Sequence, residues 1–356
     1  MTLLKAKPAI NTGLIAQSKW VTTPTVVANS GHHSATLIVF VALLARPPRA
    51  MDIRDNQEAR VSARWKRLAE ATRVKPGSNV DLAKEFDPGR HDKQLRKDSG
   101  AAALADAKAA LVDLQDRFFA QADRALLIIL QAIDAAGKDG TIKHVMSGIN
   151  PEGVDVYSFK APSATERAHD YLWRHQRTLP ELGRIAVFNR SHYENVLITR
   201  VHPEMLWPRT AALDSKDIWQ RRYRDINDWE RYLTDNGTLI VKLFLNVSKG
   251  EQERRFLKRI DEPAKNWKFS VADLRERAFW DDYQRAFQDM LSHTSTDWAP
   301  WHVIPADHKW FSHLSVSAVL LEMLRDLNPQ YPQVNAAAKA ELAEAKKQLL
   351  GNEGSA

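Results

Sequence analysis

The fold is decided by the stretch Ala125-Leu-Leu-Ile-Ile-Leu-Gln-Ala-Ile-Asp-Ala-Ala-Gly-Lys-Asp-Gly-Thr141. It opens with a continuous apolar run of strand length, residues 125–133, which is typical of a strand buried on both faces of a parallel sheet. A turn containing glycine follows, and a helix is predicted to begin at Lys138. A strand, a tight turn and a helix N-terminus in this order predict a phosphate cradle, because backbone N–H groups point at the anion and the lysine neutralises its oxygens.

The turn departs at two positions from the usual phosphate loop, G-x-x-x-x-G-K-S/T. Ala132 replaces the first glycine, and Asp139 replaces the hydroxyl residue that normally contacts Mg²⁺. The buried strand before the turn and the helix after it still supply the context that the motif requires. The residues predicted to bind phosphate here are Ala135, Ala136, Gly137, Lys138, Asp139, Gly140 and Thr141. The alternative is an ordinary strand–helix turn with a surface lysine.

Asp134 lies inside this loop, where a bare carboxylate would repel phosphate. A cation between the two groups would remove the repulsion, and Mg²⁺ prefers one or two carboxylates together with phosphate oxygens. We therefore predict that Asp134 is an Mg²⁺ ligand. The alternative is an Asx-turn residue that only stabilises the loop.

Strands and helices alternate along the rest of the chain. Strands are predicted at 154–159, 184–188, 238–247 and 301–305, and a loop at 76–99. Helices are predicted at 55–75, 101–122, 138–147, 163–179, 191–201, 217–233, 251–260, 271–292, 310–327 and 336–350. Ser163 is the expected N-cap of its helix, with Glu166 completing a capping box. This alternation indicates parallel crossovers, so the expected fold is α/β with a central parallel sheet and helices on both faces.

A second group of polar residues follows the third predicted strand, in Ala186-Val-Phe-Asn-Arg-Ser-His-Tyr-Glu194. Residues at strand carboxyl ends line the crevice where open α/β sheets bind ligands. Asn189 stands where phosphate-loop enzymes usually have an aspartate, and Arg190 can stabilise charge on a transferring phosphoryl group. We predict that Glu194 supplies the missing carboxylate. The alternative is that Glu194 only favours a helix N-terminus through the helix dipole.

The composition limits the classes of protein that this chain can belong to. Of 356 residues, 44% are hydrophobic and 27% charged, which is ordinary for a globular protein. The chain has no cysteine, which excludes disulfides, thiolate metal sites and a thiol nucleophile. A cysteine-free chain fits a reducing compartment, and we predict a cytoplasmic protein. The longest apolar run, residues 35–45, is about half of what a bilayer span needs, so no membrane partner is expected.

The net charge of +7 comes mostly from the first 50 residues, which contain five basic residues and no acid. The remainder has 46 bases and 44 acids, so nucleic acid is not an expected partner and any polyanion site must be local. Residues 1–50 are rich in Ser and Thr and lack a helical or strand period. We predict that they form a disordered extension, although a transit peptide has a similar composition. The predicted domain then covers 51–330, followed by a peripheral helix and tail at 331–356.

With these motifs in view, the sequence resembles the polyphosphate kinase 2 family between about residues 55 and 330. The resemblance is carried by Asp134-Ala-Ala-Gly-Lys-Asp-Gly-Thr141, His144-Val-Met-Ser-Gly-Ile-Asn-Pro151, Tyr157-Ser-Phe-Lys160, His169-Asp-Tyr-Leu-Trp-Arg174 and Phe188-Asn-Arg-Ser-His-Tyr-Glu194. Many relatives have Asp-Arg-Ser-Trp-Tyr-Asn in place of Asn-Arg-Ser-His-Tyr-Glu. The form seen here resembles the branch that acts on both nucleoside monophosphates and diphosphates. The resemblance implies a P-loop-kinase-like three-layer sandwich with a helical lid.

The resemblance also implies a reaction, in which inorganic polyphosphate reversibly donates its terminal phosphoryl group to AMP or ADP with Mg²⁺. Asp134 would hold the metal, Lys138 would hold phosphate, and Arg190 would lie at the point of transfer. Asn189 and Glu194 would share the metal-facing role of the family's second aspartate, and the asparagine departs from the family pattern.

The resemblance further places the lid at about 249–277, with Arg255, Lys258 and Arg259 as its phosphate-binding residues. For each of these three side chains, a solvated helix face is the alternative. A homo-oligomer is expected. Two other functions stay open at this stage: an ATP-dependent P-loop nucleoside or nucleotide kinase, and a polyanion-binding protein without catalytic activity.

Overall fold

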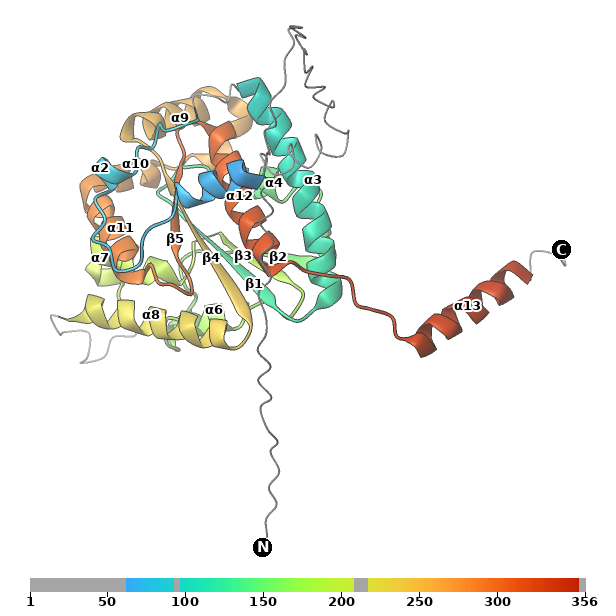
Figure 1. The fold of residues 1–356 in the computed structure, drawn as a ribbon. Coiled ribbons are helices and arrows are strands. Elements are labelled where there is room, and N and C mark those ends of the chain that lie inside the picture. The colour runs from blue at the N-terminus through green and yellow to red at the C-terminus, as the bar shows by residue number, and fades with distance from the viewer. Residues whose placement is uncertain (1–61, 93–96, 208–216, 352–356) are drawn as a thin grey trace, which may run out of the picture. The chain divides into compact units, whose positions relative to one another are not determined.

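The structure is a computed structural model that describes residues 62–92, 97–207 and 217–351. A five-stranded sheet forms its centre, with all neighbouring strands parallel and in the order β2-β3-β1-β4-β5 (Figure 1). The strands are β1 (Ala125–Gln131), β2 (Val154–Ser158), β3 (Ile185–Asn189), β4 (Thr238–Asn246) and β5 (Trp301–Pro305). The predicted strands are all present, and the predicted α/β fold with a central parallel sheet is confirmed.

Strand β1 lies in the middle of the sheet, and all seven of its residues are buried. Leu126, Ile128 and Leu130 face one hydrophobic core. Leu127 and Ile129 face a second core on the other side of the sheet. The continuous apolar run in the sequence therefore reflects burial on both faces, which is worth about 1.5–3 kcal/mol for each large side chain removed from water.

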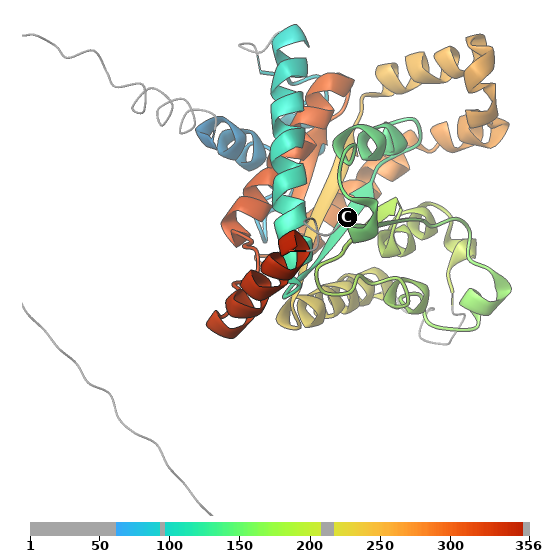
Figure 2. The same cartoon turned by 90° about the vertical axis from the view of Figure 1, so that its right-hand side faces the viewer.

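Helices cover both faces of this sheet (Figures 1 and 2). The first core is closed by α3 (Lys97–Gln121), α4 (Lys138–Val145), α12 (Lys309–Leu327) and a helix at residues 62–70. The second core is closed mainly by α8 (Ile218–Asp235), α11 (Trp280–Thr294) and α7 (Ile198–Val201). Gly100 lets α3 approach α12 closely, since a Cβ at this position would lie 2.5 Å from the ring of Trp310.

The predicted helix at 163–179 is wrong as a continuous element. Its start is confirmed, because Ser163 and Glu166 form the expected capping box at α5 (Ala164–Arg167). The helix then stops, and α6 (Trp173–Gln176) begins separately. The cause is the Asp170 side chain, whose Oδ1 accepts hydrogen bonds from the backbone N–H groups of Leu172 (2.8 Å) and Trp173 (3.1 Å) and starts a new turn.

Two further predicted helices are also divided. The segment 191–201 forms the 3₁₀ helix η2 (His192–Val196) and then α7, with non-helical dihedral angles of φ −111° and ψ −83° at Leu197. The segment 271–292 forms α10 (Val271–Arg277) and α11, separated at Phe279, where ψ is 21°. The hydrophobic period continues across each break, so the period alone did not reveal the change in direction.

Several predicted boundaries shift. The predicted loop at 76–99 contains α2 (Leu82–Glu85) and the start of α3. Other described elements are η1 (Pro151–Gly153), η3 (Pro203–Met205) and the terminal helix α13 (Ala336–Gly351). Residues 1–50, for which an extension is predicted, lie outside the described residues. Across the parts that the structure describes, no helix has both the length and the apolar composition needed to cross a bilayer.

The segment predicted as a lid is helical. It consists of α9 (Lys249–Asp261), η5 (Pro263–Lys268) and α10, which follow the carboxyl end of β4 (Figure 2). The hydroxyl of Ser248 caps α9 by accepting a hydrogen bond from the N–H of Glu251 at 3.1 Å. The segment therefore begins at the same sheet edge as the phosphate loop.

Candidate active site

The loop between β1 and α4 has the conformation of an anion cradle. Gly137 is the N-cap of α4 and has a φ of +116°, in the left-handed region that favours glycine. A Cβ at Gly137 would come no closer than 3.7 Å to another atom, so the backbone conformation rather than lack of space requires glycine here. Ala135 also has a positive φ, of 63°. Among the described residues, no side chain caps the start of α4, so the N–H groups of its first turn are available to an anion in the loop.

Lys138 lies at the base of this loop and is buried. Its Nζ donates to the carbonyl oxygens of Ala132 at 2.7 Å and Ile133 at 3.4 Å. Burial lowers the pKa of Lys138 to about 8, and the neighbouring Arg190 contributes, while nearby carboxylates, including that of Asp134, oppose the shift. The loop carbonyls therefore orient the ammonium group before any ligand arrives.

Arg190 connects the two groups of polar residues that the sequence places far apart. Its Nη2 pairs with Oδ1 of Asp134, and its backbone N–H donates to the carbonyl of Leu130 at 3.1 Å. Its φ is +83°, a left-handed conformation that costs a non-glycine residue of order 1–3 kcal/mol and is found most often at functional sites. The end of β3 thus brings a guanidinium group to the phosphate loop.

Asn189 joins three elements at the same edge of the sheet. Its Nδ2 donates to Oδ1 of Asp139, at the start of α4, at 2.9 Å, and to Oγ of Ser158, at the end of β2, at 3.3 Å. The amide nitrogen, which cannot bind a cation, is therefore the atom turned toward Asp139.

Glu194 lies in η2 and interacts with the site from one side. Burial raises the pKa of Glu194 above its ordinary value, while the cations of Arg190 and Lys138 oppose this shift. With its amide nitrogen turned toward the carboxylate, Gln131 donates to Oε1 of Glu194 at 3.2 Å. Glu194 is therefore within the electrostatic field of Lys138 and Arg190, and its metal-facing role stays a prediction.

These residues surround a cleft of about 770 Å³ at the carboxyl edge of the sheet. Every predicted site residue except Glu194 is among the described residues that line it. Three carboxylates, Asp134, Asp139 and Asp273, also line the cleft. They face nine basic side chains, namely Lys138, Lys160, Arg190, Arg255, Lys258, Arg259, Lys265, Lys268 and Lys309.

The cations of the cleft are close enough to affect one another. Burial lowers the pKa of Lys309, and Arg255, Lys258 and Lys265 lower it further. A cleft that is lined mainly by charges of one sign concentrates ions of the opposite sign. The cleft is therefore built for a polyanion, and the near-neutral total charge of the chain beyond residue 50 concealed this.

The predicted lid residues behave differently from one another. Arg255 is buried, and its guanidinium donates from Nε to Oε1 of Glu251, from Nη1 to the carbonyls of Ala135 and Ala136, and from Nη2 to those of Ala306 and Asp307. All five N–H groups of this side chain are thereby occupied. Burial lowers the pKa of Arg255 to about 10. In this structure Arg255 holds the phosphate loop in place.

Lys258 and Arg259 retain more freedom. Lys258 is 57% exposed and its Nζ lies 3.3 Å from a carboxylate oxygen of Glu262. Arg259 Nη1 lies 3.6 Å from Oδ2 of Asp273 and donates to the carbonyl of Lys268 at 3.1 Å. Such partly exposed pairs contribute little to stability, so both cations can turn toward an anion in the cleft.

Arg255→Met is expected to destabilise the protein by about 3–5 kcal/mol, because the loop carbonyls and Glu251 lose a buried charged partner. The matched control is Lys258→Met, which lies on the same helix but is exposed and is expected to change stability by less than about 0.5 kcal/mol. Denaturant unfolding of both variants measures this difference. Equal stability of the two variants would contradict the structural role of Arg255.

Sequence reasoning missed residues from the ends of β2 and the start of α12. Phe159 and Lys160 follow β2, while Lys309, Ser312 and His313 lie in the first two turns of α12. His313 is only 8% exposed, and its ring stacks on that of His144 with centroids 4.6 Å apart. The order of the elements could have revealed the residues of α12. This helix follows β5, and the carboxyl ends of parallel strands lie at one edge of the sheet.

The side chains of the cleft fit the magnesium ion that the sequence predicts only if phosphate supplies some of its ligands. Within the described residues, no group of three or more His, Asp or Glu side chains is close enough to hold a metal by itself. Mg²⁺ commonly takes only one or two carboxylates and completes its shell with phosphate oxygens and water. Asp134 fits this pattern, because its 30% exposed carboxylate lines the cleft beside the phosphate loop. The residues present therefore fit a metal that arrives with its phosphate ligand.

Comparison with known proteins identifies the family. The sequence profile of polyphosphate kinase 2 matches residues 94–332. This chain belongs to the polyphosphate kinase 2 family. The family predicted from the sequence motifs is confirmed, and with it the prediction of an enzyme. The matched region covers β1 to β5, so it contains both groups of polar residues that line the cleft.

Two relatives and one solved structure each match most of the chain. An ADP-polyphosphate phosphotransferase of Rhodopseudomonas palustris is 50% identical over 284 residues, which are 78% of this chain and 97% of the relative. An AMP/ADP-polyphosphate phosphotransferase of Meiothermus ruber is 44% identical over 268 residues, or 75% and 97% of the two chains. The crystal structure of polyphosphate kinase 2 from Arthrobacter aurescens matches with a TM-score of 0.70 at 43% identity, covering 78% of this chain and 96% of that one.

Proposed function

We propose that this enzyme transfers the terminal phosphoryl group of inorganic polyphosphate to AMP and ADP, reversibly and with Mg²⁺. The observation that carries the proposal is the cleft itself, where nine basic side chains surround a phosphate loop. A single nucleoside triphosphate does not need so many cations, whereas a long polyanion does. The names of the relatives from R. palustris and M. ruber support the choice of donor and acceptors.

In the proposed reaction a phosphate oxygen of the acceptor nucleotide attacks the terminal phosphorus of polyphosphate. The bond from this phosphorus to its bridging oxygen breaks, so the polymer becomes one phosphate shorter and the nucleotide one phosphate longer. The transfer requires little covalent chemistry from the protein and depends on alignment and charge neutralisation. Lys138 and the helix α4 N-terminus bind phosphate oxygens, and Arg190 stabilises charge on the phosphoryl group in transit.

When bound, Mg²⁺ would neutralise negative charge on phosphate. Asp134 would hold it, and Asn189 and Glu194 remain the other proposed metal-facing residues. The backbone of residues 135–141, together with Lys258 and Arg259, is proposed to bind the donor. Arg255 is proposed to act on the donor through the loop carbonyls that it holds.

A donor and acceptor assay tests the function. Purified protein is incubated with AMP or ADP, with either polyphosphate or ATP as donor, and with or without Mg²⁺. Nucleotide products that require both polyphosphate and Mg²⁺ are expected. Transfer from ATP but not from polyphosphate would replace the proposal with an ATP-dependent kinase, and binding without transfer would replace it with a polyanion-binding protein.

The pH dependence of the reaction should follow Lys138. Its pKa of about 8 means that the ammonium form, which binds phosphate, is present below this pH and is lost above it. We therefore expect kcat/KM for polyphosphate, which reports the free enzyme, to fall as the pH rises through about 8. The arginine in Lys138→Arg stays charged over this range, so the residual activity of that variant should lack the alkaline limb. An identical limb in both proteins would assign it to another group.

Glu194 should matter more than Asn189 for the metal. Glu194→Gln keeps the shape and removes the charge that attracts Mg²⁺, so a fall in kcat of about 10²-fold is expected that excess Mg²⁺ partly restores. Asn189→Ala should cost less, since its Nδ2 only connects Asp139 and Ser158. Rates measured against Mg²⁺ concentration decide this. Unchanged kcat in Glu194→Gln with a small drop in Tm would favour the alternative role at the helix N-terminus.

Two further parts of the proposal concern the whole protein. The cysteine-free composition supports placing the enzyme in the cytoplasm. A homo-oligomer remains a prediction, and light scattering after size-exclusion chromatography measures it directly.

A further inference from the structure

A buried ion pair that does not line the cleft takes no part in the proposed transfer. Lys242 of β4 and Glu230 of α8 are both fully buried, with Nζ 2.6 Å from Oε2. Removing two such charges from water costs several kcal/mol for each ion, and apolar side chains of similar volume are often as stabilising or more so. Stability alone therefore does not explain this pair.

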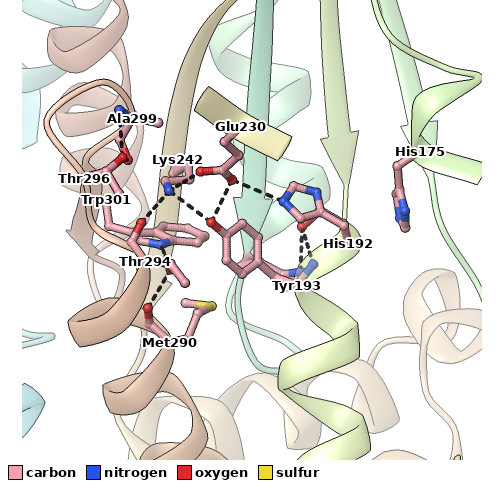
Figure 3. Close-up of polar contacts among 12 residues, drawn as sticks. His175, His192, Tyr193, Glu230, Lys242, Met290, Thr294, Thr296, Ala299 and Trp301 are labelled. Carbon is pink, nitrogen blue, oxygen red and sulfur yellow. Dashed lines mark hydrogen bonds and ion pairs between the residues drawn. The ribbon is translucent and has the colours of Figure 1, made fainter. Parts of the chain in front are cut away.

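Two neighbouring side chains complete a closed hydrogen-bonded cluster (Figure 3). Lys242 Nζ also donates to the hydroxyl of Tyr193 at 3.0 Å and to the carbonyl of Thr294 at 2.6 Å. The Tyr193 hydroxyl donates to Oε1 of Glu230 at 2.7 Å, and Nε2 of His192 lies 3.2 Å from the same oxygen. We call His192, Tyr193, Glu230 and Lys242 the buried cluster, and all four residues are fully buried.

The buried cluster is connected to the active site through the backbone. His192 and Tyr193 lie between Arg190 and Glu194 in the sequence, so they fix the short segment that carries both charged groups. Arg190 has a φ of +83°, and strained residues persist only where their surroundings over-determine the conformation. The side chains of His192 and Tyr193, which follow Arg190 after Ser191, are both anchored to Glu230 and supply such a constraint.

We propose that the buried cluster positions Arg190 and Glu194 against the phosphate loop, with Tyr193, Glu230 and Lys242 as positioning residues. The proposal rests on the proposed function insofar as these two charged groups act on phosphate. The Tyr193 hydroxyl is the decisive atom, because it connects the segment to both ions of the pair. The ring of Tyr193 packs on Trp301 with centroids 4.8 Å apart, so ring packing survives when the hydroxyl is removed.

Tyr193→Phe tests this with the loss of one oxygen atom. We expect kcat to fall about 10-fold while the KM values for both substrates change less than about 2-fold, since a small displacement of aligned groups slows transfer more than it weakens binding. The matched control is Tyr223→Phe on α8. Tyr223 is 2% exposed and its hydroxyl accepts a hydrogen bond from Arg200 at 2.8 Å, outside the segment 189–194. Its kcat should stay within about 2-fold of the wild type, even if its Tm falls.

A double-mutant cycle separates positioning from a merely structural effect. If Tyr193 acts through Glu194, then Tyr193→Phe in a Glu194→Gln background should lower kcat by less than about 2-fold. A repeated 10-fold loss in that background would contradict positioning of Glu194.

Hydrogen exchange tests the same proposal without any activity. Amide exchange across residues 189–197, which include the Arg190 N–H bonded to Leu130, should be about 5-fold faster or more in Tyr193→Phe and unchanged in Tyr223→Phe. If the wild-type protein showed no polyphosphate-dependent transfer, the proposed function would be refuted. The exchange rates would still test whether the buried cluster holds the segment 189–197 in place. Unchanged exchange in Tyr193→Phe would overturn the positioning role. If Tyr193→Phe does not fold, the double variant Glu230→Leu/Lys242→Met takes its place under the same criteria.

Discussion

Lys138→Ala is expected to lower kcat by about 10²–10⁴-fold, because phosphate charge in the transition state loses its closest cation. The effect should exceed that of removing any one cation of the lid. Lys138 is buried at the bottom of the phosphate loop, and its Nζ is already oriented by the carbonyls of Ala132 and Ile133. Initial rates at saturating nucleotide and polyphosphate measure this. The fold should survive, because the two hydrogen bonds that are lost leave carbonyls that water can reach once the side chain is gone.

The matched control is Lys143→Ala, which removes the same charge from an exposed position of the same helix α4. It should leave kcat within about 2-fold of the wild type, as expected of surface substitutions away from the cleft. Near-normal turnover in Lys138→Ala would refute the assignment of the phosphate loop. A loss of similar size in both variants would indicate a general effect of positive charge instead.

Arg190→Gln is expected to lower kcat by about 10³-fold, the lower end of the range for an arginine that stabilises a phosphoryl group in transit. Two effects contribute. The guanidinium charge is lost, and the carboxylate of Asp134 loses the partner with which it pairs in the structure. Arg190→Lys should recover only part of the rate, because an ammonium group lacks the planar fork of the guanidinium. Steady-state kinetics of both variants provides the measurement.

Arg184→Gln is the control for this prediction. Arg184 also pairs with an aspartate, Asp155, at 2.8 Å, but it precedes β3 and so lies at the opposite end of the strand from the cleft. The kcat of Arg184→Gln should stay within about 2-fold of the wild type, because a surface ion pair contributes at most about 1 kcal/mol to stability. If Arg190→Gln behaved like this control, Arg190 would not lie at the point of transfer.

The sequence was sufficient for the fold class because the deciding signals are local. The run at 125–131 has the length and composition typical of a strand buried on two faces, and Gly137 and Lys138 mark where the chain turns into a helix. Parallel order follows from the alternation of strands and helices, and the edge where Asn189 and Arg190 meet the phosphate loop follows from parallel order. The position of the cleft at this edge of the sheet was therefore predictable from the ends of the strands.

The partners of individual side chains were decided only by the tertiary structure. Arg255 has the sequence context of a lid cation, yet packing of α9 against the phosphate loop turns its guanidinium onto backbone carbonyls. Lys309 lines the cleft from a helix that begins more than 150 positions after the phosphate loop in the sequence. Glu230 and Lys242 carry no local sign of pairing, since one lies on a helix and the other on a strand.

The physical reason for this division is the range of the interactions involved. Hydrophobic period, glycine conformation and capping act within a few residues, so they are legible in the sequence and determined the strands, the phosphate loop and the capping box at Ser163. Burial, ion pairing and the break at Phe279 depend on which distant surfaces meet. The break at Asp170 is local, but it comes from one side chain that competes with the helix and that the hydrophobic period does not reveal. The sequence by itself indicated where a phosphate site would form, and the tertiary structure decided which side chains line the cleft there and which hold the phosphate loop in place.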